Sequence, residues 1–115
     1  MCPHADAIAP DGVTPYYRVV KENPVTSDCF LPAKPREGVD PCILKAVSIF
    51  NSLDGIRNGY SRIPAMRNKQ GLIATLVLQP QDGFIKQTGN EGYHYSWWRS
   101  TEFNFENVQV QIVGQ

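Results

Sequence analysis

The apolar residues fall into short segments of strand length that are separated by polar residues, glycine and proline. Residues 16–20 (YYRVV) are rich in aromatic and β-branched side chains, which is typical of a β-strand. Residues 42–50 (CILKAVSIF) predict a second strand. Residues 72–78 (LIATLVL) are apolar without alternation, and this continuity indicates a strand covered on both faces. We therefore expect residues 72–78 to form the central strand of a sheet.

Two reversals of the chain are predicted after this strand. The segments 79–83 (QPQDG) and 88–92 (TGNEG) have the composition of tight turns. A short strand is expected between them at residues 84–88. Residues 72–98 should therefore form an antiparallel meander.

The third strand of this meander is the aromatic-rich segment 92–99 (GYHYSWWR), which contains both tryptophans. Side chains alternate along a strand, so one face should carry Tyr93, Tyr95 and Trp97, and the other His94, Ser96 and Trp98. We interpret the first face as core, because large aromatic residues supply much of the buried area of a small domain. A platform on which a ligand stacks is the alternative. The second face is half polar and is interpreted as the floor of a cleft.

One helix is predicted between the second and third strands. Asn51 or Ser52 can cap its N-terminus. Its apolar residues have helical spacing and form one stripe that should lie on the sheet: Leu53, Ile56, Tyr60 and Ile63. Pro64 ends or kinks the helix near Ile63.

The last segment completes the expected fold. Residues 107–113 (NVQVQIV) alternate cleanly, which predicts an edge or terminal strand. The fold class is therefore α+β, with a mostly antiparallel sheet of five or six strands and one principal helix, at about 52–63, packed on it. Residues 1–15 predict a flexible N-terminal arm that is ordered only if something holds it. Residues 16–115 predict a single globular domain.

Charge and length exclude several classes of partner. Eleven basic and eleven acidic side chains cancel, so no net field favours binding to nucleic acid or to an anionic membrane. No stretch approaches the roughly 18 apolar residues of a membrane span. Neither a membrane nor a nucleic acid is therefore expected as partner.

The three cysteines bear on the cellular compartment and on metal binding. They are odd in number and have no CxxC spacing, which argues against a disulfide framework and favours the reducing cytoplasm. Cys2, His4, Cys29, Cys42 and His94 include zinc-ligand types, but structural zinc sites usually pair close ligands, and the one close pair here, Cys2 and His4, lies in the expected N-terminal arm. No metal site is predicted, and Cys29 and Cys42 are interpreted as small buried hydrophobes.

The common catalytic motifs are missing from the sequence. The nucleophile elbow G-x-S-x-G, the phosphate loop G-x-x-x-x-G-K-[ST] and the dinucleotide motif G-x-G-x-x-G do not occur. No spacing marks two carboxylates as a catalytic pair. The missing motifs therefore give no indication of an enzyme, but they do not exclude one.

The order of several motifs resembles two groups of proteins. YYRVV, VTSDCFLP, AVSIFNSLDG, IATLVL, FIKQTG and YHYSWW, over residues 16–98, look like a family of small bacterial proteins with no established activity. More distantly, an arginine on the first strand, a serine before the helix and an aromatic strand with histidine are similar in order to compact ADP-ribosyltransferase-like domains.

The second resemblance implies roles for individual residues. Arg18 would hold a phosphate of NAD, Ser48 would position the nicotinamide ribose, and Trp98 or Tyr95 would stack on the nicotinamide. The sequence departs from that pattern at the catalytic glutamate, because neither Glu102 nor Glu106 lies in a recognisable motif.

Our leading hypothesis is a cytoplasmic binding module without a resident cofactor. Its partner would be a protein, which includes a second copy of the chain, or a small ligand. The proposed contact surface consists of Arg18, Ser48, His94, Ser96, Trp98 and Arg99, since tyrosine, tryptophan and arginine most often anchor interfaces. These residues could equally only complete the core and its rim.

Two alternatives remain. An ADP-ribosyltransferase-like enzyme that binds NAD should bring Arg18, Ser48 and His94 together in one concave pocket. In a binder of single-stranded nucleic acid, Lys86 and Arg99 would accompany aromatic residues that stack on bases. The zero net charge disfavours that second alternative.

Overall fold

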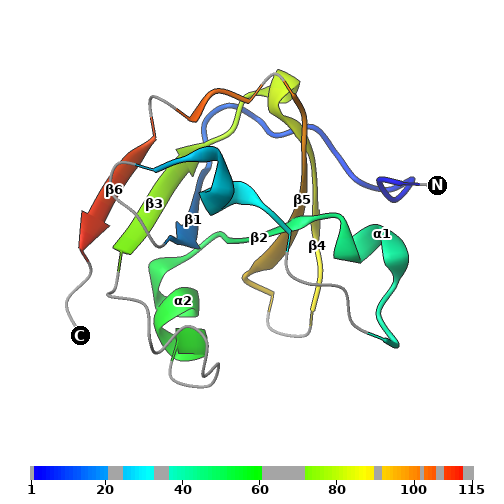
Figure 1. Ribbon diagram of the computed structural model, residues 1–115, viewed down its shortest axis with the longest axis horizontal. Coiled ribbons are helices and arrows are strands. Elements are labelled where there is room, and N and C mark those ends of the chain that lie inside the picture. The colour runs from blue at the N-terminus through cyan, green and yellow to red at the C-terminus, as the bar shows by residue number, and fades with distance from the viewer. Residues whose placement is uncertain are drawn as a thin grey trace.

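The computed structural model describes residues 2–20, 25–32, 37–60, 72–89, 92–101, 103–105 and 108–112. A single sheet with short helices packed on it forms the body of the molecule (Figure 1). The elements follow in the order β1 (Pro15–Val19), η1 (Ser27–Phe30), α1 (Pro41–Leu44), β2 (Val47–Phe50), α2 (Leu53–Tyr60), β3 (Leu72–Val77), η2 (Pro80–Asp82), β4 (Gly83–Gln87), β5 (His94–Arg99) and β6 (Gln109–Ile112). The η elements are single 3-10 turns.

In the described residues the sheet has six strands in the order β4-β5-β2-β1-β3-β6, and every neighbouring pair is antiparallel. The predicted α+β class with a mostly antiparallel sheet is therefore confirmed. The strand β6 lies at one edge, as the alternation of residues 107–113 predicts. The strand β3 is internal, but it is not the middle strand of the order.

The predicted meander over residues 72–98 is wrong. The hairpin β4–β5 forms, but β3 pairs with β1 on one side and with β6 on the other. Both edges of β3 are therefore occupied, and β4 begins at the far end of the order. The turn at Gly83 has a φ of 130°, and a Cβ there would collide with the carbonyl oxygen of Trp98. Only glycine fits this position, where the backbone at the start of β4 lies close to that of β5.

Residues 42–44 are helical and do not extend the strand that the apolar run 42–50 predicts. The backbone N–H of Cys42 donates to Oδ1 of Asp40 at 2.8 Å. Pro41 occupies the first turn of α1, where its fixed φ favours a helix. The local cap therefore overrides the apolar pattern, and the strand β2 begins only at Val47.

The predicted helix at about 52–63 corresponds to α2, and residues 61–63 lie outside the described residues. Ser52 caps it, because the Ser52 hydroxyl accepts from the N–H of Gly55 at 3.0 Å. Leu53 and Ile56 of the predicted stripe pack in one apolar cluster with Phe50. The described part of the chain holds two short α-helices, α1 and α2, so a single principal helix is not confirmed.

The sheet is covered on both faces. The main core lies on the face covered by Phe30 of η1 and consists of twelve buried residues, including Ile49, Leu76 and Trp97. A second cluster lies on the opposite face under α2 and contains Phe50, Ile56 and Ile73. Burial of both Ile73 and Ala74 confirms that β3 is covered on its two faces.

The N-terminal segment 2–14 runs from beside α1, past β4, to β1 (Figure 1). The sequence predicts that this arm is ordered only if something holds it, and a disulfide and a backbone bridge are among the contacts that do so. A disulfide joins Cys2 to Cys42, whose Cα atoms are 5.3 Å apart. Ile8 and Ile85 form an isolated antiparallel bridge with hydrogen bonds of 2.9 and 2.8 Å.

The disulfide corrects the interpretation of the cysteines. The expectation that they form no disulfide is wrong for Cys2 and Cys42, while Cys29 is a buried free thiol, as predicted. The two partners are 40 residues apart, so no local spacing reveals them. Among the described residues, no helix is long and apolar enough to cross a membrane.

Candidate functional site

The strand β5 directs its two tryptophans to opposite faces of the sheet. Trp97 is fully buried in the main core, and its Nε1 donates to the Asp82 carbonyl at 3.0 Å. Trp98 lies on the other face with 8% of its surface exposed, and its Nε1 donates to the Cys42 carbonyl at 2.9 Å. The alternation that the sequence predicts for these two residues is confirmed.

The predicted aromatic row of three is only partly correct. Tyr95 and Trp97 pack on the main core. Tyr93 packs instead in the second cluster, where its ring lies 6.0 Å from that of Phe50. The reason is that β5 begins at His94, so the alternation of the strand does not extend back to Tyr93.

Ser96 and His94 belong to a small hydroxyl network on the face of Trp98. The Thr88 hydroxyl lies 2.8 Å from the Ser96 hydroxyl and 3.0 Å from Nδ1 of His94. Only 2% of the surface of Ser96 is exposed, whereas Ser48, its partner across β2 and β5, is exposed. The predicted cleft floor is therefore covered at Ser96.

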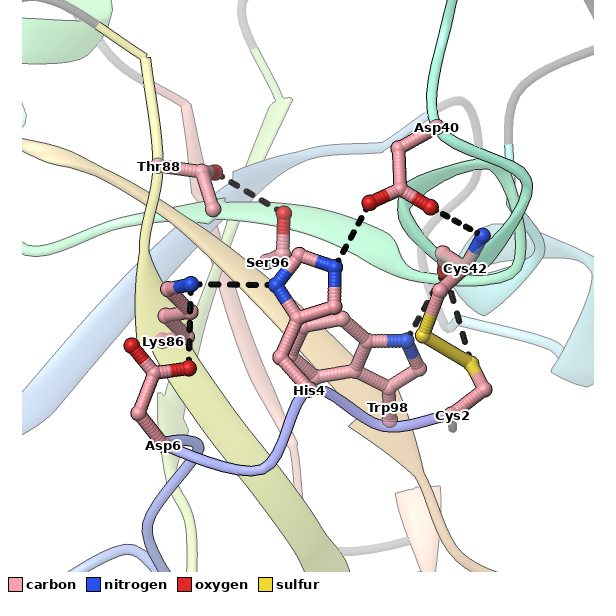
Figure 2. A network of polar contacts seen from close by, with 9 residues as sticks. All are labelled: Cys2, His4, Asp6, Asp40, Cys42, Lys86, Thr88, Ser96 and Trp98. Carbon is pink, nitrogen blue, oxygen red and sulfur yellow. Dashed lines mark hydrogen bonds and ion pairs between the residues drawn. A yellow bond between two sulfur atoms is a disulfide. The ribbon is translucent and has the colours of Figure 1, made fainter.

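The cover comes in part from the N-terminal arm, whose polar contacts are drawn in Figure 2. The His4 ring lies 5.4 Å from the Trp98 ring. Its Nε2 is 2.8 Å from Oδ2 of Asp40, and its Nδ1 is 3.0 Å from Nζ of Lys86. An ammonium group only donates, so Nδ1 accepts from Lys86 and Nε2 carries the proton that Asp40 accepts. Lys86 also pairs with Asp6 at 3.0 Å.

These contacts perturb the two carboxylates of the network. The backbone N–H of Cys42, followed by the hydrogen bond from His4, lowers the pKa of Asp40. The hydrogen bond from Lys86 lowers the pKa of Asp6. Both carboxyl groups are therefore charged near neutral pH.

An open pocket of about 420 Å³ lies beside this network, at the end of the β4–β5 hairpin. Its lining consists of Cys2, Pro3, Lys45, Gly83, Phe84, Trp98, Arg99 and Ser100. Phe84 stands opposite Trp98 in the hairpin register, and 46% of its surface is exposed. Lys45 and Arg99 are both exposed, and neither forms an ion pair within the described ranges. The pocket thus combines apolar aromatic surface with two cations.

Arg18 lies away from this pocket and serves the backbone. Its side chain shares the parity of Tyr16 and Val20, which belong to the main core on the opposite face. Its guanidinium donates to three carbonyls, those of Cys29 at 2.6 Å, Ser48 at 2.7 Å and Leu31 at 3.2 Å. Burial lowers the pKa of Arg18 to about 10. Arg18 therefore ties η1 to β2.

The six predicted site residues divide into three groups. Trp98 and Arg99 line the pocket, while His94 and Ser96 join through Thr88. Ser48 and Arg18 lie apart from the pocket. The convergence of Arg18, Ser48 and His94 that the enzyme alternative requires does not occur in this pocket, and NAD binding stays a prediction. Glu102 and Glu106 lie outside the described residues.

Sequence reasoning missed Phe84 and Lys45 as pocket residues and His4 as the cover of Trp98. The predicted turn at residues 88–92 would set Phe84 opposite Ser96, on the same face as Trp98, whereas the observed register sets it opposite Trp98. Lys45 and His4 come from segments far apart in sequence, so no local signal identifies them. Among the residues that the structure describes, no group of three His, Cys, Asp or Glu side chains could hold a metal ion.

Comparisons with protein-family models, with curated proteins and with solved structures find no match to this chain.

Proposed function

We propose that the protein is a binding module, and that its pocket captures an acidic segment of a partner polypeptide. The observation that carries the proposal is the pairing of a half-exposed aromatic ring, Phe84, with two cations, Lys45 and Arg99, around one opening. The pocket contains Trp98 and Arg99 of the predicted contact surface, together with Phe84 and Lys45 from other elements.

The apolar part of the pocket would supply affinity. Phe84 is one of the few large hydrophobic side chains that the described residues leave substantially exposed. Covering its ring with an apolar side chain of a partner removes surface from water, which stabilises the complex. Trp98 backs Phe84 from the neighbouring strand. A single aromatic or aliphatic anchor would therefore fit here.

The two cations would select the charge of the partner. The whole chain has no net charge, so the preference must come from local groups such as Lys45 and Arg99. An arginine guanidinium accepts a carboxylate with two parallel hydrogen bonds, and a lysine adds a second positive charge. A glutamate or aspartate beside the anchor would satisfy both groups.

The openness of the pocket favours a polypeptide over a cofactor. Its volume of about 420 Å³ would accommodate either a small molecule or side chains of a polypeptide, so the volume does not distinguish them. An open pocket leaves much of a small molecule in water, whereas a polypeptide can continue its contacts across the surrounding surface. The exposed strand surface of β4 offers such a continuation.

The test is a titration of the protein with terminally blocked dipeptides. Binding is monitored by tryptophan fluorescence, in which we expect Trp98 to respond. Acetyl-Phe-Glu-amide should produce a saturable change. Acetyl-Phe-Gln-amide, which lacks the carboxylate, and acetyl-Ala-Glu-amide, which lacks the ring, should bind more weakly. The proposal is wrong if the three peptides give the same response, or if none binds.

Variants of the protein locate the binding. Arg99→Gln should remove the preference for Glu over Gln, and Phe84→Ala should remove the preference for Phe over Ala. Leu31→Ala is the matched control, because Leu31 is exposed to a similar degree, 48%, outside the pocket lining. An equal loss of binding in Leu31→Ala and Phe84→Ala would contradict the assignment.

A further inference from the structure

We infer that the Cys2–Cys42 disulfide is a site of thiol–disulfide exchange with an external dithiol, and that its reduction releases the N-terminal arm from Trp98. The consequence for ligand binding rests on the function proposed above, whereas the exchange and the release of the arm do not. The inference starts from where the two sulfur atoms lie.

The disulfide is accessible from one side only. Cys2 is exposed and forms part of the pocket lining, so an incoming thiolate can reach its Sγ. Cys42 has only 8% of its surface exposed and is not among the lining residues. Lys45 and Arg99, which line the same pocket, would attract a negatively charged thiolate. Attack is therefore expected at Cys2.

The exchange is a balanced two-electron reaction. One thiolate of the dithiol attacks Sγ of Cys2, the Cys2–Cys42 bond breaks, and Cys42 leaves as a thiolate that takes a proton from water. The second thiol of the reductant then loses its proton to water and attacks the reductant sulfur of the mixed disulfide, so that Cys2 leaves as a thiolate and takes a proton from water. The products are two protein thiols and the cyclic disulfide of the reductant.

Once the disulfide is broken, the first residues of the arm keep the packing of the His4 ring on Trp98 and of Ala7 against the same cluster. Their polar contacts end on carboxylates that are open to solvent. Asp40 and Asp6, which bind His4 and Lys86, have side chains that are 49% and 70% exposed. A hydrogen bond and an ion pair to carboxylates this exposed hold a chain weakly. The next attachment is the single bridge between Ile8 and Ile85. The disulfide is therefore the covalent restraint on residues 2–7, and the remaining contacts are individually reversible.

Release of these residues changes the pocket directly. Cys2 and Pro3 form one wall, and the His4 ring covers Trp98. Without them the opening widens across Trp98 toward Lys86. The oxidised protein would thus present a narrow pocket and the reduced protein a broader aromatic surface.

The experiment uses the full chain with Cys29→Ser, which removes the buried free thiol and leaves the disulfide intact. The protein is treated with increasing concentrations of dithiothreitol and alkylated with iodoacetamide, and its mass is measured by mass spectrometry. Acrylamide quenching of tryptophan emission is recorded in parallel. We expect two alkylated thiols together with a red shift and stronger quenching.

Two further variants assign the change. Cys2→Ser should show the stronger quenching without reductant, because its arm cannot be tethered. Trp98→Phe should lose the change altogether, because Trp97 stays in the core. Amide exchange should rise at Ala7, whose N–H donates to the His4 carbonyl within the released residues, and should stay slow at Ala74 in β3.

Three results would overturn the inference. They are the absence of a Cys2–Cys42 disulfide in the untreated protein, alkylation of both thiols without a change in Trp98 quenching, and fast exchange at Ala74, which would mean that reduction unfolds the whole domain. None of these readouts uses a peptide. Failure of the dipeptide titration therefore contradicts the binding function alone, and failure here contradicts the exchange site alone.

Discussion

Trp97 and Trp98 are neighbours in the chain, yet they belong to regions of different construction. Trp97 is enclosed by side chains of the main core, with the rings of Phe30 and Phe103 at 6.3 and 4.7 Å. Trp98 is covered by the His4 ring of the arm and opens into a pocket. One residue is covered by packed secondary structure, and the other by a tethered segment.

Because of this difference, Trp97 should contribute mainly to the stability of the fold, whereas the cover of Trp98 should be removable without unfolding. Packed apolar side chains cannot be removed one at a time without leaving a cavity. A cover made of a disulfide and a few exposed polar contacts can be lifted while the sheet beneath stays intact. The same strand therefore contributes to the core on one face and to a candidate binding surface on the other.

The largest effect is expected from removing Trp97. Trp97→Ala should lower the free energy of unfolding by about 3–5 kcal/mol, because it leaves a cavity at the centre of the main core. Trp98→Ala should cost no more than about half as much, since the arm over it can relax. Urea unfolding of both variants measures the two losses. Equal losses would contradict the contrast between the faces.

The next largest effect is expected at Arg18. Arg18→Met should lower the free energy of unfolding by roughly 2–3 kcal/mol, because the carbonyls of Cys29 and Ser48 lose their donor. Arg18→Lys should recover only part of this loss, since one ammonium group lacks the planar fork of a guanidinium. Urea unfolding measures both. Dipeptide binding should be unchanged in Arg18→Lys, and weaker binding would place Arg18 at the binding surface.

A smaller effect is expected at Gly55, where the helix covers the face of Trp98. A Cβ at Gly55 would lie 2.6 Å from Cγ of Tyr93, so either the ring or the helix must move. This collision outweighs the helix propensity gained from alanine, which is at most about 1 kcal/mol. Gly55→Ala should therefore lower the thermal midpoint of unfolding. A higher midpoint would mean that Tyr93 gives way without cost.

The smallest effect is expected from acid, and it should appear on the arm. Hydrogen bonds from the Thr14 hydroxyl and from the N–H groups of Thr14 and Val13 lower the pKa of Asp11 to about 2. A lowered pKa stabilises the folded state fully above the ordinary value of 3.8, and the stabilisation is lost as pH falls toward about 2.

The thermal midpoints of the wild type and of Asp11→Asn measure this contribution. They should differ at neutral pH and converge as pH falls from 3.8 toward 2. A difference that does not depend on pH would show that the amide itself disturbs the turn. Convergence above pH 3.8 would contradict the lowered pKa.

The sequence predicts the local elements of the fold better than their partners. The strands at 16–20 and 72–78 follow from composition over a few residues. The pairing of β3 with β1 and β6 is non-local, so no pattern within residues 72–98 indicates that β3 pairs elsewhere and not in a meander. The apolar run 42–50 predicts a strand, whereas Asp40 and Pro41 in front of it form a helix start signal, and the structure follows the start signal at α1.

The candidate site was predicted only where one strand contains it. Trp98 and Arg99 are adjacent in β5, and the alternation assigned Trp98 to the correct face. The cover by His4 depends on a disulfide between residues 40 positions apart, which composition argued against. Lys45 reaches the pocket from the end of α1. Such contacts arise from packing of whole elements, and a pattern along the chain does not contain them.

The central claim is that Trp98, and not Trp97, faces a binding site. The most direct measurement is a proton–nitrogen correlation spectrum of the two indole N–H groups during a titration with acetyl-Phe-Glu-amide. The account predicts that the Trp98 signal moves in a saturable manner while the Trp97 signal stays in place. Movement of neither signal, or of Trp97 with Trp98 unchanged, would contradict it.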